Sequence, residues 1–549
     1  MTNVQDAEIT PAGYNHAPGT ELLFESGKPG AAHPHLQTIE NSDGNHIILV
    51  PQPSLTDPND PLRWPKVKKW GTLLNGTAYS FMGSVTGPIM AGMMLSLADG
   101  FGVPLQKVTW ALGVTLICQG FGNVFWMPLA IKFGRRPVYL FSNLLMGIAC
   151  IWQGLACTST YTAFFVGRAF LGIVEAPIES IVPTTITDMF FLHDRGEKVS
   201  AYGLSVLGGN ELGPLFSALI VQYLGNAWAF YIVAMFIFLN VATMFFTMPE
   251  TKYRGNRPEN IWNADEVDDL GEKSFAQTVE DTVKSDSASA EAAPVEIAKH
   301  SYLSELRFWG KSDPDVNLRK VFLRPFVLVT YPTVIWACFV YGMSLGWNVI
   351  MGATVAQLFA PPPYNFNSQA QGLVFLSPFV GSIIGSWLCG SVSDSIANYF
   401  TLKNGGIREP EMRLPTLAIG TFLTLFGTLM TGLTYHYQTH WAGPVVGFGV
   451  LTAGAQMGVS LSMTYALDCH KELSVELMVA VASIKSSIAW IWTWIINDWI
   501  AADGMLMVFM IIAGINVVAH LSTILLFLKG KSVRVWIHER DMLGRCGLH

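Results

Sequence analysis

Charged residues are scarce in this sequence. Only 13% of its 549 residues are Asp, Glu, Lys or Arg, whereas 51% are hydrophobic, and a typical soluble domain has about 25% charged residues. A chain of this length with so little charge is too apolar for an ordinary soluble protein. The net charge of −7 says little about partners, because the charges gather in particular loops.

The signatures of several function classes are missing as well. Seven cysteines lie mostly inside apolar stretches without paired spacing, which predicts neither a disulfide framework nor a zinc site. The N-terminus has no basic segment followed by an apolar core, so we expect the first spanning helix to direct insertion. No Walker A glycine loop supports ATP-driven transport. The histidines are scattered without a nucleophile arrangement, so we predict no enzyme, no cofactor and no metal site.

Long apolar stretches are what the sequence has in plenty. Each runs for roughly 20 residues, enough to cross about 30 Å of hydrocarbon. Six precede a polar segment and six follow it, which predicts an all-α polytopic membrane protein with twelve transmembrane helices in two six-helix bundles. The stretches lie at 70–97, 108–131, 137–157, 161–188, 199–222 and 228–248, and then at 325–350, 369–393, 413–435, 441–467, 474–498 and 504–528.

The polar segments complete the expected organisation. It comprises a disordered cytoplasmic arm at 1–62, a first bundle at 63–249, a cytoplasmic linker at 250–324, a second bundle at 325–528 and a cytoplasmic tail at 529–549. The linker ends in SYLSELRFWG, which could place Tyr302, Leu303, Leu306 and Trp309 on one side of a short helix at the membrane surface. A plain linker with scattered aromatics explains these residues equally well.

Basic residues indicate the orientation of the chain. They follow every second apolar stretch, as Lys132, Arg135 and Arg136 do after the second, whereas the loops of the other parity contain essentially one, Lys107. Loops rich in Lys and Arg stay on the cytoplasmic side of a membrane. We therefore predict a multi-pass protein of the cell membrane with both termini and the linker in the cytoplasm.

One apolar stretch carries charges in its interior. The segment Gly167–Pro183 is predicted to lie in one continuous helix, and its Arg168, Glu175 and Glu179 fall within an arc of roughly 40°. Charges in hydrocarbon cost several kcal/mol each and normally face a protein interior or a watery cavity. Two carboxylates one turn apart there could exchange a proton during a transport cycle. A fixed Arg–Glu bridge is the alternative, and Pro183 is expected to permit bending.

Two more charges lie deep in predicted spans. Glu211, near the middle of the fifth, is either a second proton site or a packing acid satisfied by a neighbour. Lys485, near the midpoint of the eleventh, could bind an anionic substrate group or compensate one of the glutamates. Trp492 and Trp499 share its helical stripe, so a cation–π neighbour is available.

One loop motif resembles a signature of the major facilitator superfamily. After the second stretch, KFGRRPVYL is similar to the second half of the loop signature G-x-x-x-D-R-x-G-R-R, with Gly134, Arg135 and Arg136 in place. Met127 and Ile131 stand where the signature has glycine and aspartate. The usual Asp-centred charge relay therefore cannot be carried over to this loop.

Three further motifs agree with the resemblance. GSVSD after the eighth stretch keeps a G-x-x-x-D remnant with Asp394, but without paired arginines. The R-x-x-x-G that begins at Arg168 resembles a signature linked in this superfamily to proton coupling. GGNELGP resembles the G-x-x-x-G-P of its antiporters, with Gly209, Gly213 and Pro214 in register. Because Pro214 leaves a backbone carbonyl free, it is a candidate hinge.

The resemblance covers about residues 60–540, and VEAP, MPETKYRG and YALDCHKEL are similar to fungal drug:proton antiporters and their polyamine- and metabolite-transporting relatives. In this fold the first, fourth, seventh and tenth helices line a central cavity. For each polar residue on such helices, a buried hydrogen bond between helices is the alternative. The candidate cavity residues are Asn75, Tyr79, Tyr341, Asn348, Gln456, Ser460 and Lys485.

The sequence thus predicts a proton-coupled secondary transporter that works by alternating access, with Arg168, Glu175, Glu179 and Glu211 in proton coupling. The GGNELGP likeness favours antiport, and hence export of a xenobiotic or secondary metabolite. Proton-linked uptake of an organic cation or polyamine is the alternative, and a non-transporting membrane sensor on the same fold is another. The expected partners are a small-molecule substrate and the lipid bilayer, with no nucleic acid, for a monomer driven by the proton gradient.

Overall fold

A computed structural model describes most of the chain outside its polar segments. The described residues are 21–22, 38–40, 46–48, 51, 53–54, 57–255, 299, 301–308, 313–314, 316–404, 407–470, 473–540 and 542–548. Most of the arm at 1–62 and much of the linker at 250–324, Trp309 included, lie outside these residues. The predicted surface helix of the linker is a single turn, α10 (Tyr302–Glu305).

In the described residues, ten helical segments are long and apolar enough to cross a membrane. Those of the first half are α3 (Leu105–Phe133), α4 (Arg135–Ala156), α7 (Leu192–Leu224) and α8 (Asn226–Thr247). Uninterrupted ones of the second half are α12 (Pro332–Phe359), α16 (Leu417–His436), α17 (Ala442–Cys469) and α18 (Ser474–Asp503).

Two composite segments complete the ten. One comprises α13 (Ser368–Val374), α14 (Leu376–Trp387), the π-helical turn η3 (Leu388–Val392) and α15 (Ser393–Lys403). The other comprises α19 (Met505–Leu521), α20 (Thr523–Arg540) and α21 (Met542–Arg545). The predicted tail at 529–549 is therefore largely helical, since α20 continues through it to Arg540.

The first predicted span is broken into three parts. They are α1 (Lys66–Thr86), the 3-10 turn η2 (Pro88–Gly92) and α2 (Met94–Phe101). Pro88 has no N–H and cannot continue the ladder of α1. The break leaves the Thr86 carbonyl at the C-terminal end of α1, and Gly87 becomes the N-cap of η2.

The fourth predicted span is also broken, so the prediction of one continuous helix through Gly167–Pro183 is wrong. The helix α5 (Tyr161–Glu175) ends before Pro177, and α6 (Ile178–Met189) begins after it. A proline at 177 cannot donate to the carbonyl of Ile173 four residues earlier, and the indole of Trp126 donates to that carbonyl at 2.7 Å instead. Pro183, where the sequence predicts bending, lies inside α6, and the helix continues past it to Met189.

Shorter elements lie at the ends of these helices. They are η1 (Pro61–Arg63), α11 (Leu318–Leu328), η4 (Pro410–Thr416) and four short strands, β1 (Glu21–Leu22), β2 (Thr38–Glu40), β3 (His46–Ile48) and β4 (Ile407–Arg408). The strand β1 pairs with β4, and β2 pairs with β3, both antiparallel.

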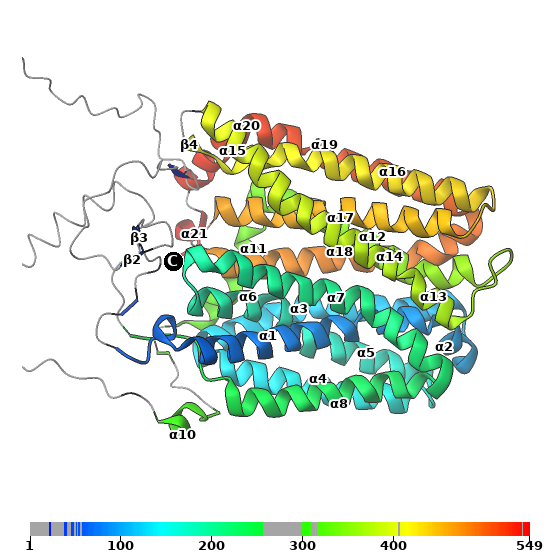
Figure 1. Ribbon diagram of the computed structural model, residues 1–549, viewed down its shortest axis with the longest axis horizontal. Coiled ribbons are helices and arrows are strands. Elements are labelled where there is room, and N and C mark those ends of the chain that lie inside the picture. The colour runs from blue at the N-terminus through cyan, green and yellow to red at the C-terminus, as the bar shows by residue number, and fades with distance from the viewer. Residues whose placement is uncertain are drawn as a thin grey trace, which may run out of the picture.

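The helices run side by side along one axis and form two halves (Figure 1). The first half, in blue to green, holds α1–α8, and the second half, in yellow to red, holds most of the later helices. The start of α1 and the end of α20 lie at one end of the bundle, here called the terminal side; α2 and α13 lie at the other, the far side. With the two broken spans, the prediction of twelve crossings in two six-helix bundles is confirmed.

The halves touch along a few helix pairs. The helix α3 packs along α18, α7 packs against α13 and α14, η2 packs against α12, and α6 packs against α18. Most of the buried apolar side chains form one cluster in the first half and two in the second. Each half thus has most of a core of its own, although Ala356 and Val479 of the second half belong to the first cluster and Ala91 of the first half belongs to a second-half cluster.

Candidate functional site

The two halves meet near their middle at a buried ion pair. Lys485 of α18 donates to Glu179 of α6, with Nζ and Oε1 2.6 Å apart. The same Nζ is 3.4 Å from the hydroxyl of Tyr341 and 4.8 Å from the centre of its ring. The Lys485 side chain is 8% exposed and that of Glu179 is 23% exposed. Separation of the halves at this level must break the pair.

Of the two roles open for Lys485, the structure shows compensation of a glutamate. The aromatic partner expected from its own helix is wrong, because the cation–π contact is with Tyr341 and not with Trp492 or Trp499. Side chains on a helix tilt toward its N-terminus, so Lys485 reaches away from Trp492, which lies seven residues further on. The pattern of residues along one helix does not predict contacts with side chains of other helices, such as Tyr341 and Glu179.

Arg168 caps the broken first span. Its two terminal nitrogens donate to the carbonyls of Thr86 and Gly87, each at 2.8 Å, and its side chain is fully buried. A cation at a helix C-terminus satisfies free carbonyls and complements the negative end of the helix dipole. In the described part of the chain no carboxylate lies within ion-pair distance of Arg168, so the alternative of a fixed Arg–Glu bridge is absent here.

Glu175 reaches the same break through a hydroxyl. Its Oε2 lies 2.6 Å from Oγ1 of Thr86, which in turn lies 2.7 Å from the carbonyl of Gly83. A threonine has one hydroxyl proton. If Glu175 is ionised, Thr86 donates to it; if Glu175 is protonated, it donates to Thr86 and frees that hydroxyl for the Gly83 carbonyl. The site accommodates either protonation state. Thr86 shares a helical stripe with Asn75 and Tyr79, which the sequence shows, but its contact with Glu175 was not predicted.

Glu211 is buried in the interior of α7 with a relative exposure of 4%. Among the described residues no hydrogen-bond or ion-pair partner of its carboxylate is found. At 100° per residue it lies between Leu215 and Ala218, the two residues of α7 that meet Gly372 of α13. Glu211 therefore lies on the side of α7 that faces the second half.

The antiporter-like motif around Glu211 packs α7 onto α1. A Cβ at Gly209 would overlap the backbone and side chain at Phe81 and Ser84, and Gly213 lies against Val85. The carbonyl of Pro214 approaches Gly92 in η2 and accepts from Ser217 at 2.9 Å. These glycines pack α7 closely on the broken first span, and Glu211 lies on the opposite side of α7.

Two candidate cavity residues of α1 contact other helices of the first half. Asn75 donates to Thr247 at 2.7 Å and accepts from Thr243 at 2.8 Å, both in α8. The hydroxyl of Tyr79 lies 2.7 Å from Ser142 of α4. Neither is in hydrogen-bond contact with the Lys485 ion pair. Their polar atoms make the interhelical hydrogen bonds that were the alternative to a cavity role.

The candidate residues of the second half are placed differently. Gln456 donates to Ser460 within α17 at 3.1 Å. The side-chain oxygen of Asn348 is buried without a hydrogen-bond partner. Two pairs of the seven candidates are in contact: Gln456 with Ser460 inside α17, and Tyr341 of α12 with Lys485 of α18.

On the terminal side of the first half, the loop signature anchors the start of α4. The backbone N–H groups of Arg135 and Arg136 donate to the two oxygens of Glu250 at 2.9 and 3.1 Å. Arg135 also pairs with Asp188 at 2.5 Å. Gly134 has a φ of +104°, and a Cβ there would overlap Glu250. Glu250 and Asp188 thus hold a loop that lacks the usual aspartate, and neither was predicted.

Asp394 is the centre of the matching network in the second half. It accepts from Arg413 at 2.9 Å and from Arg408 at 3.4 Å, and Arg413 also binds Asp468 at 3.1 Å. The motif itself lacks the paired arginines of the signature, as the sequence shows. Its aspartate is instead paired with Arg408 and Arg413, which follow α15 and lie outside the spacing of the signature.

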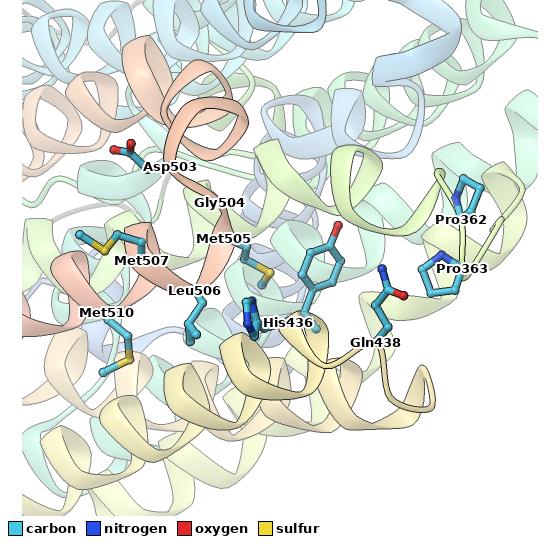
Figure 2. A pocket seen from close by; sticks show the side chains of 11 residues that line it. Pro362, Pro363, His436, Gln438, Asp503, Gly504, Met505, Leu506, Met507 and Met510 are labelled. Atoms are coloured by element: carbon cyan, nitrogen blue, oxygen red, sulfur yellow. The ribbon is translucent and has the colours of Figure 1, made fainter.

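A cavity of about 510 Å³ lies on the far side of the second half (Figure 2). Its wall combines Met505, Leu506, Met507 and Met510 with polar groups such as His436. None of the predicted site residues lines it. In the described residues no group of three or more His, Cys, Asp or Glu side chains could hold a metal ion.

These features define a multi-pass membrane protein of two pseudo-symmetric halves with buried charges between them. The chain belongs to the Major Facilitator Superfamily, whose sequence profile matches residues 72–407. This is a family of transporters that act on small molecules in a lipid bilayer.

Similar proteins agree with this assignment. An uncharacterized MFS-type transporter of Schizosaccharomyces pombe is 26% identical, over 96% of this chain and 94% of its own length. Protein HOL1 of Saccharomyces cerevisiae is 24% identical over 95% and 96%, and the MFS-type transporter penM of Penicillium rubens is 26% identical over 88% and 89%. A crystal structure of the peptide transporter POT in complex with sulfate matches with a TM-score of 0.54 at 13% identity, over 84% of this chain and 95% of that one. At that identity the likeness concerns the fold alone.

Proposed function

We propose that this protein is a proton-coupled secondary transporter that works by alternating access. The observation that carries the proposal is the Lys485–Glu179 ion pair, which joins the halves in the middle of the bundle. A proton on Glu179 removes one charge of the pair and weakens its hold on Lys485. Proton binding would then lower the free energy needed to separate the halves at that level.

The broken first span supplies a second proton-sensitive contact. Glu175 shares the hydroxyl of Thr86 at the position where Arg168 holds the free carbonyls. Protonation of Glu175 would reverse the direction of the hydrogen bond with Thr86 and alter the end of α1. Glu211, buried on the side of α7 facing the second half, is the third acid in the proposed coupling.

For the direction of transport we propose antiport, hence export of a small organic compound such as a xenobiotic or secondary metabolite. Support comes from the G-x-x-x-G-P motif, whose glycines pack α7 onto α1 in the structure. Proton-linked uptake of an organic cation or polyamine is the second candidate, because among the described residues of the centre three acids, Glu175, Glu179 and Glu211, face two cations, Arg168 and Lys485. We propose a monomer in the cell membrane with cytoplasmic termini, driven by the proton gradient without a cofactor or nucleic acid.

Growth of a transporter-deleted yeast that expresses this chain tests the proposal across a panel of toxins and polyamines. Resistance to a compound indicates export, and hypersensitivity indicates uptake. The Glu175→Gln variant should reach the membrane and lose the phenotype, whereas Glu305→Gln, on the terminal side, should keep it. A phenotype that Glu175→Gln leaves unchanged would contradict the proton role, and no phenotype with any compound would favour a sensor.

A further inference from the structure

One carboxamide joins α3 and α18 at their far-side ends. Gln106, in the first turn of α3, is 5% exposed. Its Nε2 donates to the carbonyls of Thr493 at 2.9 Å and Trp494 at 2.7 Å. Its Oε1 accepts from the backbone N–H of Asn497 at 3.1 Å. Both the donor and the acceptor ends of the side chain are therefore used across the boundary between the halves.

The groups that Gln106 contacts belong to the backbone of α18. The carbonyl of Thr493 and the N–H of Asn497 are four residues apart, so they are the two ends of one helical turn. Gln106 bonds to both ends of that turn and also to the carbonyl that follows Thr493. A contact of this kind fixes the height of α18 along α3, whatever the side chains of α18 are.

Neighbouring residues of α3 reinforce the contact. The ring of Trp110 stacks on that of Trp494 with centres 4.6 Å apart, and its Nε1 donates to the Trp494 carbonyl at 3.2 Å. Thr109 accepts from the side chain of Asn497 at 2.5 Å. Gly113 permits the approach, because a Cβ there would overlap the side chain of Thr493.

We propose that Gln106 is the latch that keeps the far side of the transporter closed, and that its three hydrogen bonds must break each time the far side opens. The inference rests on the proposed alternating access and names the residue that sets its equilibrium. It concerns neither the substrate nor the proton. Gln106 lies at the far-side end of the contact between α3 and α18. Nearer the middle of that contact, the hydroxyl of Ser483 donates to the carbonyl of Gly120 at 2.8 Å.

The size of the effect follows from hydrogen bonds in membrane proteins, which each shift an equilibrium by a factor of about 2.7 on average. Gln106→Leu removes three of them and leaves the shape of the side chain nearly unchanged. We expect the ratio of far-side-open to far-side-closed molecules to rise about 20-fold. A shift of this size changes populations without requiring any loss of folding.

Distances between spin labels test the latch directly. One pair of labels, at Asp99 and Ala502, spans the far side, and a second pair, at Val199 and Leu402, spans the terminal side; all four residues are exposed. Labels carried on unnatural amino acids leave the seven native cysteines in place. Double electron–electron resonance on the full chain in nanodiscs then gives the population of each distance. The measurement needs neither substrate nor a proton gradient.

In Gln106→Leu we expect a longer far-side distance to gain population while the terminal-side pair becomes shorter. The matched control is Gln153→Leu, since Gln153 is a fully buried glutamine inside the first half and should leave both distributions as in the wild type. Trp110→Phe keeps an aromatic ring beside Trp494 but loses the hydrogen bond from Nε1, so a shift of about threefold is expected from that bond. It serves as the test if Gln106→Leu fails to fold.

An unchanged far-side distribution in the folded variant would overturn the latch. That failure is distinguishable from failure of the proposed function. If the wild-type distances respond to pH or substrate while Gln106→Leu behaves as the wild type does, only the latch is wrong. If no variant or condition moves either distance, the latch is overturned together with alternating access.

Discussion

At the residue scale, buried charges of the central region are held by partners on other elements. Lys485 is paired with Glu179, and Arg168 donates to the carbonyls of Thr86 and Gly87 at the end of α1. The first contact joins the two halves, whereas the second lies within the first half. Separation of the halves therefore takes the partner from Lys485 and leaves Arg168 with its own.

The Lys485–Glu179 pair predicts strong coupling between its two members. Lys485→Met leaves a carboxylate in a low-dielectric region, and removal of one partner of a buried pair costs roughly 3–5 kcal/mol. We expect Lys485→Met to lower the thermal stability in detergent, and the double variant Glu179→Gln/Lys485→Met to recover more than half of the loss. Intrinsic tryptophan fluorescence on heating measures both.

An exposed pair on the terminal side is the control. Lys531 and Glu409 are 3.0 Å apart, with side chains 44% and 18% exposed. Pairs of this kind contribute about 1 kcal/mol or less, so Lys531→Met should shift the melting curve little. Equal losses of thermal stability in Lys485→Met and Lys531→Met would show that the Lys485–Glu179 pair stabilises the protein no more than an exposed pair does.

The sequence could identify the buried charges but not their partners. Arg168, Glu179 and Lys485 stand out because each interrupts an apolar stretch, which is a local signal. The partner of Lys485 lies 306 residues away in the chain, and no periodicity within one helix reports such a contact. The same holds for Thr86: its place on the polar stripe of the first span can be predicted from the sequence, but its contact with Glu175 of α5 cannot.

At the element scale, prolines and glycines divide the spans where the function needs them divided. Pro177 separates α5 from α6, so Glu175 turns toward the broken first span while Glu179 reaches the second half. The sequence predicted twelve spans of adequate length from hydropathy, and the count is confirmed. It did not predict the breaks, because an apolar stretch with one proline is compatible with a kinked but continuous helix.

Two glycines with nearly the same backbone allow a matched test of the loop signature. Gly134 has φ +104° and ψ 169°, and Gly225 has φ +90° and ψ 169°. Alanine at either position is strained by roughly 1–3 kcal/mol. Gly134→Ala must also push away Glu250, whereas nothing lies within 4 Å of a Cβ at Gly225.

We therefore expect Gly134→Ala to destabilise the protein by about 2 kcal/mol more than Gly225→Ala does, because two charge-assisted bonds from Glu250 to the start of α4 are disturbed. Melting curves of the two variants measure the difference. When each alanine variant is combined with Glu250→Ala, most of the difference in stability between Gly134→Ala and Gly225→Ala should disappear. Equal effects of the two alanines would mean that Glu250 does not anchor α4.

At the scale of the whole molecule, each half has an Arg–Asp ion pair between neighbouring spans on the terminal side. Arg135 near the start of the third span pairs with Asp188 near the end of the fourth, and Arg413 of the ninth pairs with Asp468 of the tenth. The sequence shows a partial copy of the loop signature in each half. It did not predict that Arg408 and Arg413 bind Asp394, because they lie outside the spacing of the signature.

We expect the Arg135–Asp188 and Arg413–Asp468 ion pairs to contribute independently to stability. Arg135→Ala and Arg413→Ala lie in separate halves and share no partner, so their effects on stability should add within about 0.5 kcal/mol. The same comparison for Glu179→Gln and Lys485→Met should be strongly non-additive, since that pair joins the halves. Non-additive effects of the two terminal-side ties would indicate that the halves do not fold as separate units.

We propose that proton binding to buried acids drives transport by this protein. Flux of a compound found by the growth panel into or out of proteoliposomes under an imposed pH gradient tests this, for the wild type and for Glu175→Gln. We expect wild-type flux that reverses when the gradient is reversed, and a variant whose flux no longer responds to the gradient. Wild-type flux that is the same with and without a pH gradient would contradict it.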